Sequence, residues 1–176
     1  MIEVLIVHDS HRPGSLIEQL AGSVAAGVDE VPEVQSRTVH INDLTRDDLA
    51  RSAALILGSP NWSGISGNLK QRLDDLGDLW AEGVLTDKVG AAFTAGTSRH
   101  AGLEFTLLTI IHWLLSGGMI FAGLPWQESM RVSGSYYGAT AAGSVEEADR
   151  AQARRLGRRV AELTLRLGPG ATETPR

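Results

Sequence analysis

The chain has 176 residues, of which 43% are hydrophobic and 21% are charged, as in a globular protein with a sizeable core. The net charge of −5 argues against nucleic-acid binding, which needs a concentrated basic surface. The absence of cysteine excludes disulfides, thiolate metal sites and cysteine nucleophiles, and we predict no metal site. We see no secretory signal and no apolar stretch of bilayer length, so we expect a cytoplasmic protein without membrane contacts.

The first predicted unit is a strand followed by a helix. Residues 2–7 are short, branched and apolar without alternation, which predicts a strand buried on both faces. Gly14 and Ser15 then open a helix with apolar residues at helical spacing, and Pro32 ends that connection. Residues 34–41 form a more polar run, which predicts a second strand nearer the sheet edge.

Two helices flank the third predicted strand, residues 53–57. Thr45 and Asp48 can cap a short helix before this strand. Ser66 is a good N-cap for the helix after it. The spacing along this second helix predicts one buried face, made of Leu69, Leu73, Leu76 and Trp80.

The second half of the chain continues the alternation. We predict a strand at residues 89–93, an apolar helix at 103–115 and a fifth strand at 119–122. Ser144 and Glu147 match a capping box that would begin the last helix.

This order of elements predicts an α/β fold. Five strands that alternate with five helices are typical of a parallel sheet covered on both faces. We expect one domain over residues 1–168 and a flexible C-terminal tail at 169–176. Residues 123–145 lack a clear pattern, and so long a loop in a compact domain is usually functional or an interface.

Three predicted loops carry small and hydroxyl residues directly after an apolar strand. They are residues 9–15, 58–64 and 94–99. An open α/β sheet binds its ligand at the carboxyl ends of its strands, so the three loops can form one site. The first precedes a helix, whose unpaired N–H groups suit a phosphate, although it can equally be an ordinary turn. The chain lacks the Walker and GxGxxG motifs, which argues against a classical dinucleotide fold.

The second loop holds Trp62 between Ser59-Pro60-Asn61 and Gly64. A tryptophan in a polar loop is either a plug in the core or a platform for a flat ring, and the sequence leaves both open.

Several short motifs resemble those of a known family. The second loop continues into residues 66–70, Ser-Gly-Asn-Leu-Lys, and the next helix ends on residues 77–80, Gly-Asp-Leu-Trp. Further motifs are residues 95–97, Ala-Gly-Thr, and residues 135–140, Ser-Tyr-Tyr-Gly-Ala-Thr. Residues 4–167 thereby resemble the flavodoxin-like NAD(P)H:quinone oxidoreductases grouped with the tryptophan repressor-binding protein. The resemblance implies a doubly wound five-stranded parallel sheet of order 2-1-3-4-5.

The resemblance also implies a function and a site. The family binds FMN, forms tetramers and passes electrons from NAD(P)H to quinones, so we expect FMN, NAD(P)H, a quinone-like acceptor and a homo-oligomer, dimer or tetramer. No catalytic side chain beyond the flavin is implied. Trp62 and Trp80 are candidates for the substrate pocket, and Trp80 matches a family tryptophan that reaches toward a neighbouring subunit. The implied cofactor-binding residues are Ser10, His11, Arg12, Gly14, Ser15, Leu16, Pro60, Asn61, Trp62, Ser63, Gly64, Ala95, Gly96, Thr97, Ser98 and Arg99.

The chain also departs from the family pattern. The first loop is one residue longer, and Ser116-Gly117 stand where the family has a histidine pair. Two other functions therefore stay open: an FMN-bearing electron carrier that oxidises no nicotinamide, and a flavin-less relative that acts as a binding protein.

Overall fold

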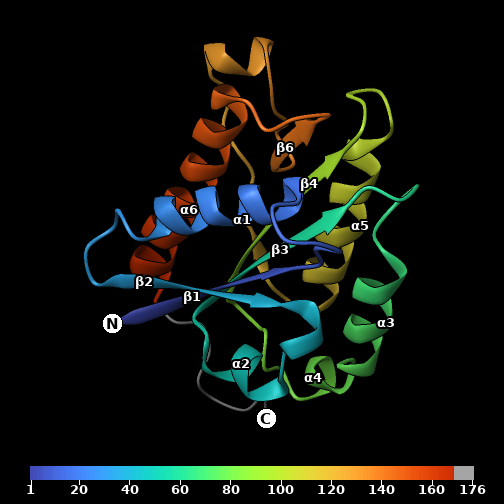
Figure 1. The fold of residues 1–176 in the computed structure, drawn as a ribbon. Coiled ribbons are helices and arrows are strands. Elements are labelled where there is room, and N and C mark those ends of the chain that lie inside the picture. The colour runs from blue at the N-terminus through green and yellow to red at the C-terminus, as the bar shows by residue number, and fades with distance from the viewer. Residues whose placement is uncertain (169–176) are drawn as a thin grey trace.

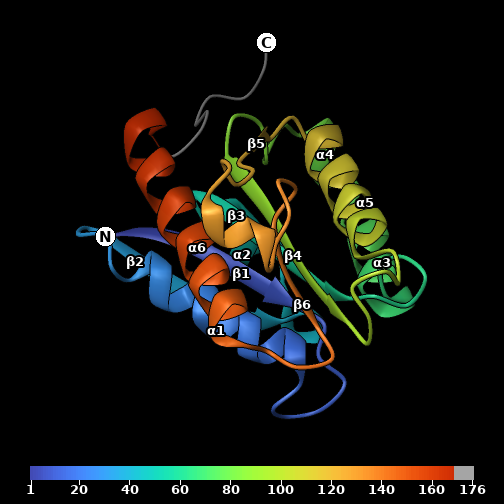
Figure 2. The ribbon, with the colours of Figure 1, turned by 90° about the horizontal axis from the view of Figure 1, so that it is seen from above.

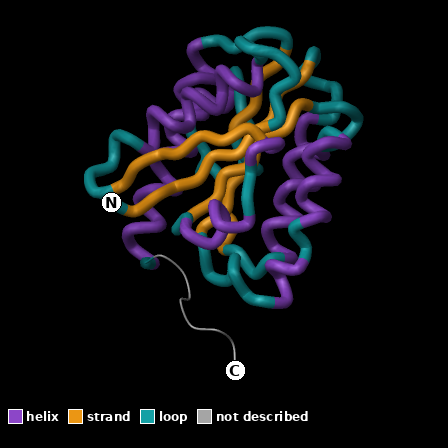
Figure 3. The backbone as a smooth tube through the Cα atoms, turned by 60° about the horizontal axis from the view of Figure 1, so that its bottom comes forward, coloured by secondary structure: helices purple, strands orange, loops and turns teal. Residues whose placement is uncertain are grey.

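Unbroken apolar runs place the central strands between two layers of helices, as the computed structural model shows for residues 1–168 (Figures 1 and 3). The sheet has the order β2-β1-β3-β4-β5, with all these neighbours parallel, and β6 also pairs with β4. This confirms the predicted doubly wound fold and its strand order. The predicted tail, residues 169–176, lies outside the described residues. The strands are β1 (Ile2–His8), β2 (Val34–His40), β3 (Ala54–Pro60), β4 (Val89–Gly96), β5 (Ile120–Phe121) and β6 (Ala139–Ala142).

Helices cover both faces of the sheet (Figure 2). On one face α1 (Leu16–Val28) and α6 (Glu147–Leu167) lie side by side, and on the other lie α3 (Gly67–Asp75) and α5 (Leu103–Ser116). Alternate residues of β1 enter two separate cores: Val4 and Ile6 join the first, Leu5 and Val7 the second. Two cores explain why the strand shows no polar alternation. The shorter helices are α2 (Arg46–Arg51), α4 (Asp78–Ala81) and the 3₁₀ turns η1 (Ile41–Asp43) and η2 (Glu128–Arg131).

Two glycines let α1 and α6 approach closely. A Cβ atom on Gly27 would lie 1.8 Å from the carbonyl oxygen of Arg154. A Cβ atom on Gly157 would lie 2.0 Å from the carbonyl oxygen of Val24. Backbone therefore packs on backbone at this crossing, and neither position has room for a side chain.

Helix caps match the sequence at three of the four predicted helix starts. Ser15 and Ser66 cap α1 and α3, and Thr45 forms the expected capping box with Asp48. The box predicted for the last helix is wrong, because Glu146 pairs with Asp149 instead. Ser144 is not free to cap the helix, since it bridges back to Ala142 and donates its hydroxyl to Glu146.

Three further predictions differ from the structure. The helix after Ser66 ends at Asp75, so Trp80 lies on the separate α4, where it is 40% exposed rather than buried. The fifth strand is shorter than expected. The long patternless segment instead supplies β6, which pairs with the end of β4 while β5 pairs with its beginning.

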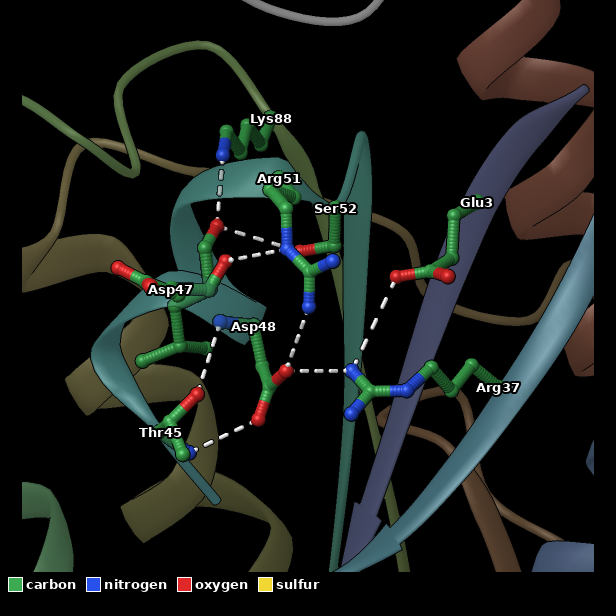
Figure 4. A network of polar contacts seen from close by, with 9 residues as sticks. Glu3, Arg37, Thr45, Asp47, Asp48, Arg51, Ser52 and Lys88 are labelled. Carbon is green, nitrogen blue, oxygen red and sulfur yellow. Dashed lines mark hydrogen bonds and ion pairs between the residues drawn. The ribbon is translucent and has the colours of Figure 1, made fainter.

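A polar network anchors α2 against the sheet (Figure 4). Buried Asp48 accepts hydrogen bonds from Arg37 Nη1 at 2.6 Å and from the backbone of Thr45 at 2.9 Å. Burial alone would raise the pKa of Asp48, but these hydrogen bonds hold it well below its usual range. The ammonium of buried Lys88 donates to the carbonyls of Leu49 and Ala50 at 2.8 and 3.0 Å, so it caps the end of the helix.

Candidate functional site

The loops after β1, β3 and β4 meet at one edge of the sheet, because parallel strands end on the same side (Figure 1). They enclose a cavity of about 690 Å³. This is the convergence that the three predicted loops required. The cavity is lined by Asp9, Ser10, His11, Arg12, Ser15, Leu16, Ile17, Pro60, Asn61, Trp62, Ser63, Ala95, Gly96, Thr97 and Ala101.

Most of the predicted site residues line this cavity, and five do not. Gly14 has a left-handed backbone at an exposed position of the first loop, and Gly64 donates its N–H to the Asn61 side chain at 3.4 Å. Ser98 accepts a hydrogen bond from the backbone of His100 inside the third loop. The last two lie elsewhere: Arg99 donates to the carbonyl of Val132, and Trp80 rests against Trp113 with ring centroids 6.0 Å apart.

The first loop ends in a helix N-terminus that an acid already occupies. The Ser15 hydroxyl accepts the backbone N–H of Glu18 at 3.2 Å. The Glu18 carboxylate in turn accepts the N–H of Gly14. An anion is stabilised here by the helix dipole, so an incoming phosphate has to compete with Glu18 for this position.

Trp62 stands at the rim of the cavity. It is 67% exposed, which excludes the core plug that the sequence left open. The second loop turns tightly at this point, with the Trp62 N–H on the Gly64 carbonyl at 2.9 Å and Ser63 at a φ of 60°. The His11 ring meets the indole edge-on at a centroid distance of 6.0 Å. The first and second loops therefore touch across the mouth of the cavity.

Asn61 ties the second loop to the third. Its backbone N–H donates to the Ala95 carbonyl at 2.8 Å, and its Nδ2 donates to the Ala101 carbonyl at 2.7 Å. Its Oδ1 accepts from the Thr106 hydroxyl of α5 at 2.8 Å. The amide group of Asn61 thus has partners in the protein itself and holds the cavity wall in place.

Asp9 is a cavity residue that the sequence analysis missed. Its side chain is 1% exposed. The carboxylate accepts one hydrogen bond from the Ser66 hydroxyl and another from Asn68 Nδ2 at 3.1 Å. Because Ser66 also caps α3, this carboxylate links the first loop to the start of that helix. The signal available in the sequence was an acid placed directly at the end of an apolar strand.

Two histidines lie behind the first loop. His40 Nε2 is 3.0 Å from the Ser10 carbonyl, and its Nδ1 accepts the N–H of Asn42, so the proton lies on Nε2. The His8 ring meets the His40 ring edge-on at 5.6 Å. Burial lowers the pKa of His8. His8 therefore stays neutral at pH 7 and is a packed core residue.

Residues 1–168 carry neither a metal cluster nor a membrane-spanning helix. No group of three or more histidine, aspartate or glutamate side chains in this range is arranged to hold a metal ion. None of the helices there has both the length and the apolar character that crossing a bilayer requires. The cytoplasmic location stays a prediction.

Comparison with known proteins identifies the family. A family model described as NADPH-dependent FMN reductase matches residues 40–126. An NAD(P)H dehydrogenase (quinone) from Gluconacetobacter diazotrophicus is 37% identical over an alignment that covers 95% of this chain and 99% of that protein. The chain belongs to the NAD(P)H dehydrogenase (quinone) family. Another relative of the same name, from Archaeoglobus fulgidus, is 43% identical over 69% of this chain, although the match spans 64% of that protein.

Solved structures agree on the fold of this family member. A flavodoxin, WrbA-like protein from Agrobacterium tumefaciens superposes with a TM-score of 0.76 at 21% identity, covering 96% of this chain and all of that one. An apo NADH:FMN oxidoreductase superposes with a TM-score of 0.70 at 17% identity, covering 98% and 92% of the two chains. Both likenesses support the flavodoxin fold predicted from the sequence.

Proposed function

We propose that this protein is an FMN-dependent oxidoreductase that passes electrons from NAD(P)H to a quinone or similar small acceptor. Its relatives over nearly the full chain are named NAD(P)H dehydrogenase (quinone), and the matching family model is named NADPH-dependent FMN reductase. The observation that carries the proposal is the cavity at the carboxyl edge of the sheet, which is the position where this fold class binds flavin mononucleotide.

The residues around the cavity fit the parts of FMN. The first loop offers the hydroxyl of Ser10 and the side chains of His11 and Arg12 beside a helix N-terminus, a donor set suited to a phosphate dianion. Pro60 and Trp62 present flat, apolar surface of the kind that packs along an aromatic ring. We assign the first loop to the phosphate, and the second and third loops to the two sides of the ring.

Bound FMN would supply the two-electron chemistry, accepting a hydride and passing it on. The chain's own residues bind the flavin and orient its ring. The exposed rings of Trp62 and His11 lie edge to face at the rim of the cavity, where they can contact the bound ring. Asn61 fixes the spacing between the loops on either side of the ring. No side chain of the cavity has to act as an acid or base, because the flavin handles its own electrons and protons.

FMN titration of the apoprotein tests this proposal. Wild-type protein is expected to bind saturably, with quenching of flavin and tryptophan fluorescence. Trp62→Ala is expected to weaken binding about tenfold or more, since aromatic stacking on a ring contributes roughly 1–3 kcal/mol. Trp126→Ala is the matched control, because Trp126 is also exposed (55%) but lies outside the cavity. Absence of FMN binding by a folded wild-type protein would refute the proposal.

Turnover separates the remaining alternatives. NAD(P)H consumption that depends on an added quinone distinguishes the oxidoreductase from an electron carrier, and the visible spectrum of the purified protein distinguishes both from a flavin-less relative. The names of the relatives do not favour the carrier. The rim of the cavity also carries Arg12 and His11, whereas an acidic surround would be expected of a carrier.

We also propose that the chain forms a homo-oligomer, a dimer or a tetramer. The support is a group of exposed aromatic side chains around one small cavity, Trp126, Tyr136 and Tyr137, since aromatic residues are enriched at protein interfaces. Sedimentation velocity gives the number of copies. A monomer at micromolar concentration would contradict this proposal without affecting the flavin site.

A further inference from the structure

A second cavity shares a wall with the first. It has a volume of about 440 Å³ and lies between the third loop, the start of α5 and the segment from Met130 to Gly134. The third loop borders both spaces: Gly96, Thr97 and Ala101 line the first cavity, and Arg99, His100 and Gly102 line the second. The two cavities share no lining residue, so this loop is the wall that separates them.

The second cavity has the chemistry of an anion site with an aromatic edge. Arg99 carries a positive charge, His100 adds ring N–H donor capacity beside it, and Glu104 is the acid among the lining residues. The Arg99 guanidinium donates to the Val132 carbonyl, which leaves most of its five N–H groups for a ligand. The ring of Phe105 is 73% exposed at the same cavity, where a flat base can stack on it.

We propose that this second cavity binds the adenosine diphosphate half of the NAD(P)H donor, with Arg99 on the diphosphate and Phe105 against the adenine. The inference rests on the proposed function. In that function the flavin and the reacting nicotinamide share the first cavity, so the other half of the dinucleotide has to extend beyond it. A quinone carries no phosphate and gains nothing from Arg99, so the second cavity serves the donor rather than the acceptor.

Two donors of different length test the proposal on the FMN-loaded enzyme. Reduced nicotinamide mononucleotide carries the reacting ring but lacks the adenosine half. Arg99→Ala is expected to raise the KM for NAD(P)H about tenfold, because a charge-assisted hydrogen bond is lost, and to leave the KM for the mononucleotide unchanged. Arg131→Ala is the matched control: Arg131 is an exposed arginine of the same segment, paired with Glu128, and does not line this cavity.

Arg99→Ala also loses the contact with Val132, so the third loop can rearrange in that variant. Phe105→Ala is a second test of the same cavity that leaves this contact in place. It is expected to raise the KM for NAD(P)H alone, as Arg99→Ala does. Direct titration with ADP provides a readout without turnover: the wild-type protein binds it, and both variants bind it more weakly.

Each other outcome has a definite meaning. Equal effects on both donors, weaker FMN binding in Arg99→Ala, or an unchanged KM for NAD(P)H would overturn the assignment of this cavity. If wild-type protein oxidises neither donor but binds ADP through Arg99, the proposed function fails while the anion site stands. If both donors turn over and ADP does not bind, the site fails while the function stands.

Discussion

The Thr106 hydroxyl of α5 donates to the side-chain oxygen of Asn61 at 2.8 Å, and this contact joins the second loop of the first cavity to the helix that follows the third loop. Thr106 is fully buried, so Asn61 is held from inside the core. The spacing of the two loops, and with it the width of the cavity, depends on a pair of residues 45 positions apart.

Removing this hydroxyl is expected to loosen the cavity. Thr106→Val keeps the shape of the side chain but leaves Asn61 Oδ1 with only the longer hydrogen bond from the Gly64 N–H at 3.4 Å, which costs about 1–2 kcal/mol of unfolding free energy. FMN affinity is expected to fall in parallel, because the two loops no longer keep a fixed separation. Thr109→Val is the control, since its hydroxyl bonds within the same helix to Phe105. Equal FMN affinity in both variants would show that Asn61 does not set the width.

The Glu18 carboxylate at the Gly14 N–H is expected to oppose phosphate binding. Glu18→Gln removes a negative charge from the place where the FMN phosphate is assigned, so FMN affinity should rise several-fold. The helix loses a favourable charge at its N-terminus, at a cost of about 0.3–1 kcal/mol of stability. Riboflavin, which lacks the phosphate, is the control ligand and should bind both proteins equally. A similar gain with riboflavin would place the effect away from the phosphate.

A glycine at the close crossing of α1 and α6 and a glycine away from it are expected to respond oppositely to substitution by alanine. Gly157→Ala places a Cβ atom against the Val24 carbonyl, so we expect a loss of about 1–3 kcal/mol in urea unfolding. Gly22 lies in α1 away from the crossing, where an added Cβ atom meets nothing within 4 Å, so Gly22→Ala should add about 0.5–1 kcal/mol of stability through helix propensity. A stable Gly157→Ala protein would mean that the helices can separate at little cost.

Lys88 is expected to make the free energy of unfolding depend on pH in the alkaline range. Burial lowers the pKa of this 5% exposed side chain from 10.5 to about 8. Between these values the unfolded chain holds a proton that the folded chain has lost, so the free energy of unfolding should rise with pH. The gain is on the order of 3 kcal/mol at most, and below pH 8 this contribution is flat. Urea unfolding at pH 7.5, 9 and 10 measures it.

Lys88→Met is the control for that slope. The variant has no ammonium to titrate, so its stability should change less between pH 7.5 and 10 than that of the wild-type protein. Identical slopes in the two proteins would assign the pH dependence to other groups.

The sequence predicted the strand order and the three loops because both follow from local pattern and from the family motifs. It missed β6, since residues 139–142 are small and short and become a strand only by pairing with β4. It also placed Trp80 on a buried face, because helical spacing does not reveal that the chain turns after Asp75. Arg99 was grouped with the flavin by its position in the third loop, whereas its contact with Val132 depends on a distant segment.

One edge of the sheet is completed by two short strands, with β5 along the beginning of β4 and β6 along its end. Residues 122–138 leave the sheet between them and contribute Met130 and Ser133 to the second cavity, while none of them lines the first. Residues of this excursion that line only the second cavity can therefore change without touching the walls of the first, whereas Gly138 cannot, because a Cβ atom there would lie 2.0 Å from the Ala92 carbonyl oxygen of β4. If the second cavity holds the adenosine half of the donor as proposed, such changes would alter the preference for one electron donor over another and leave the first cavity intact.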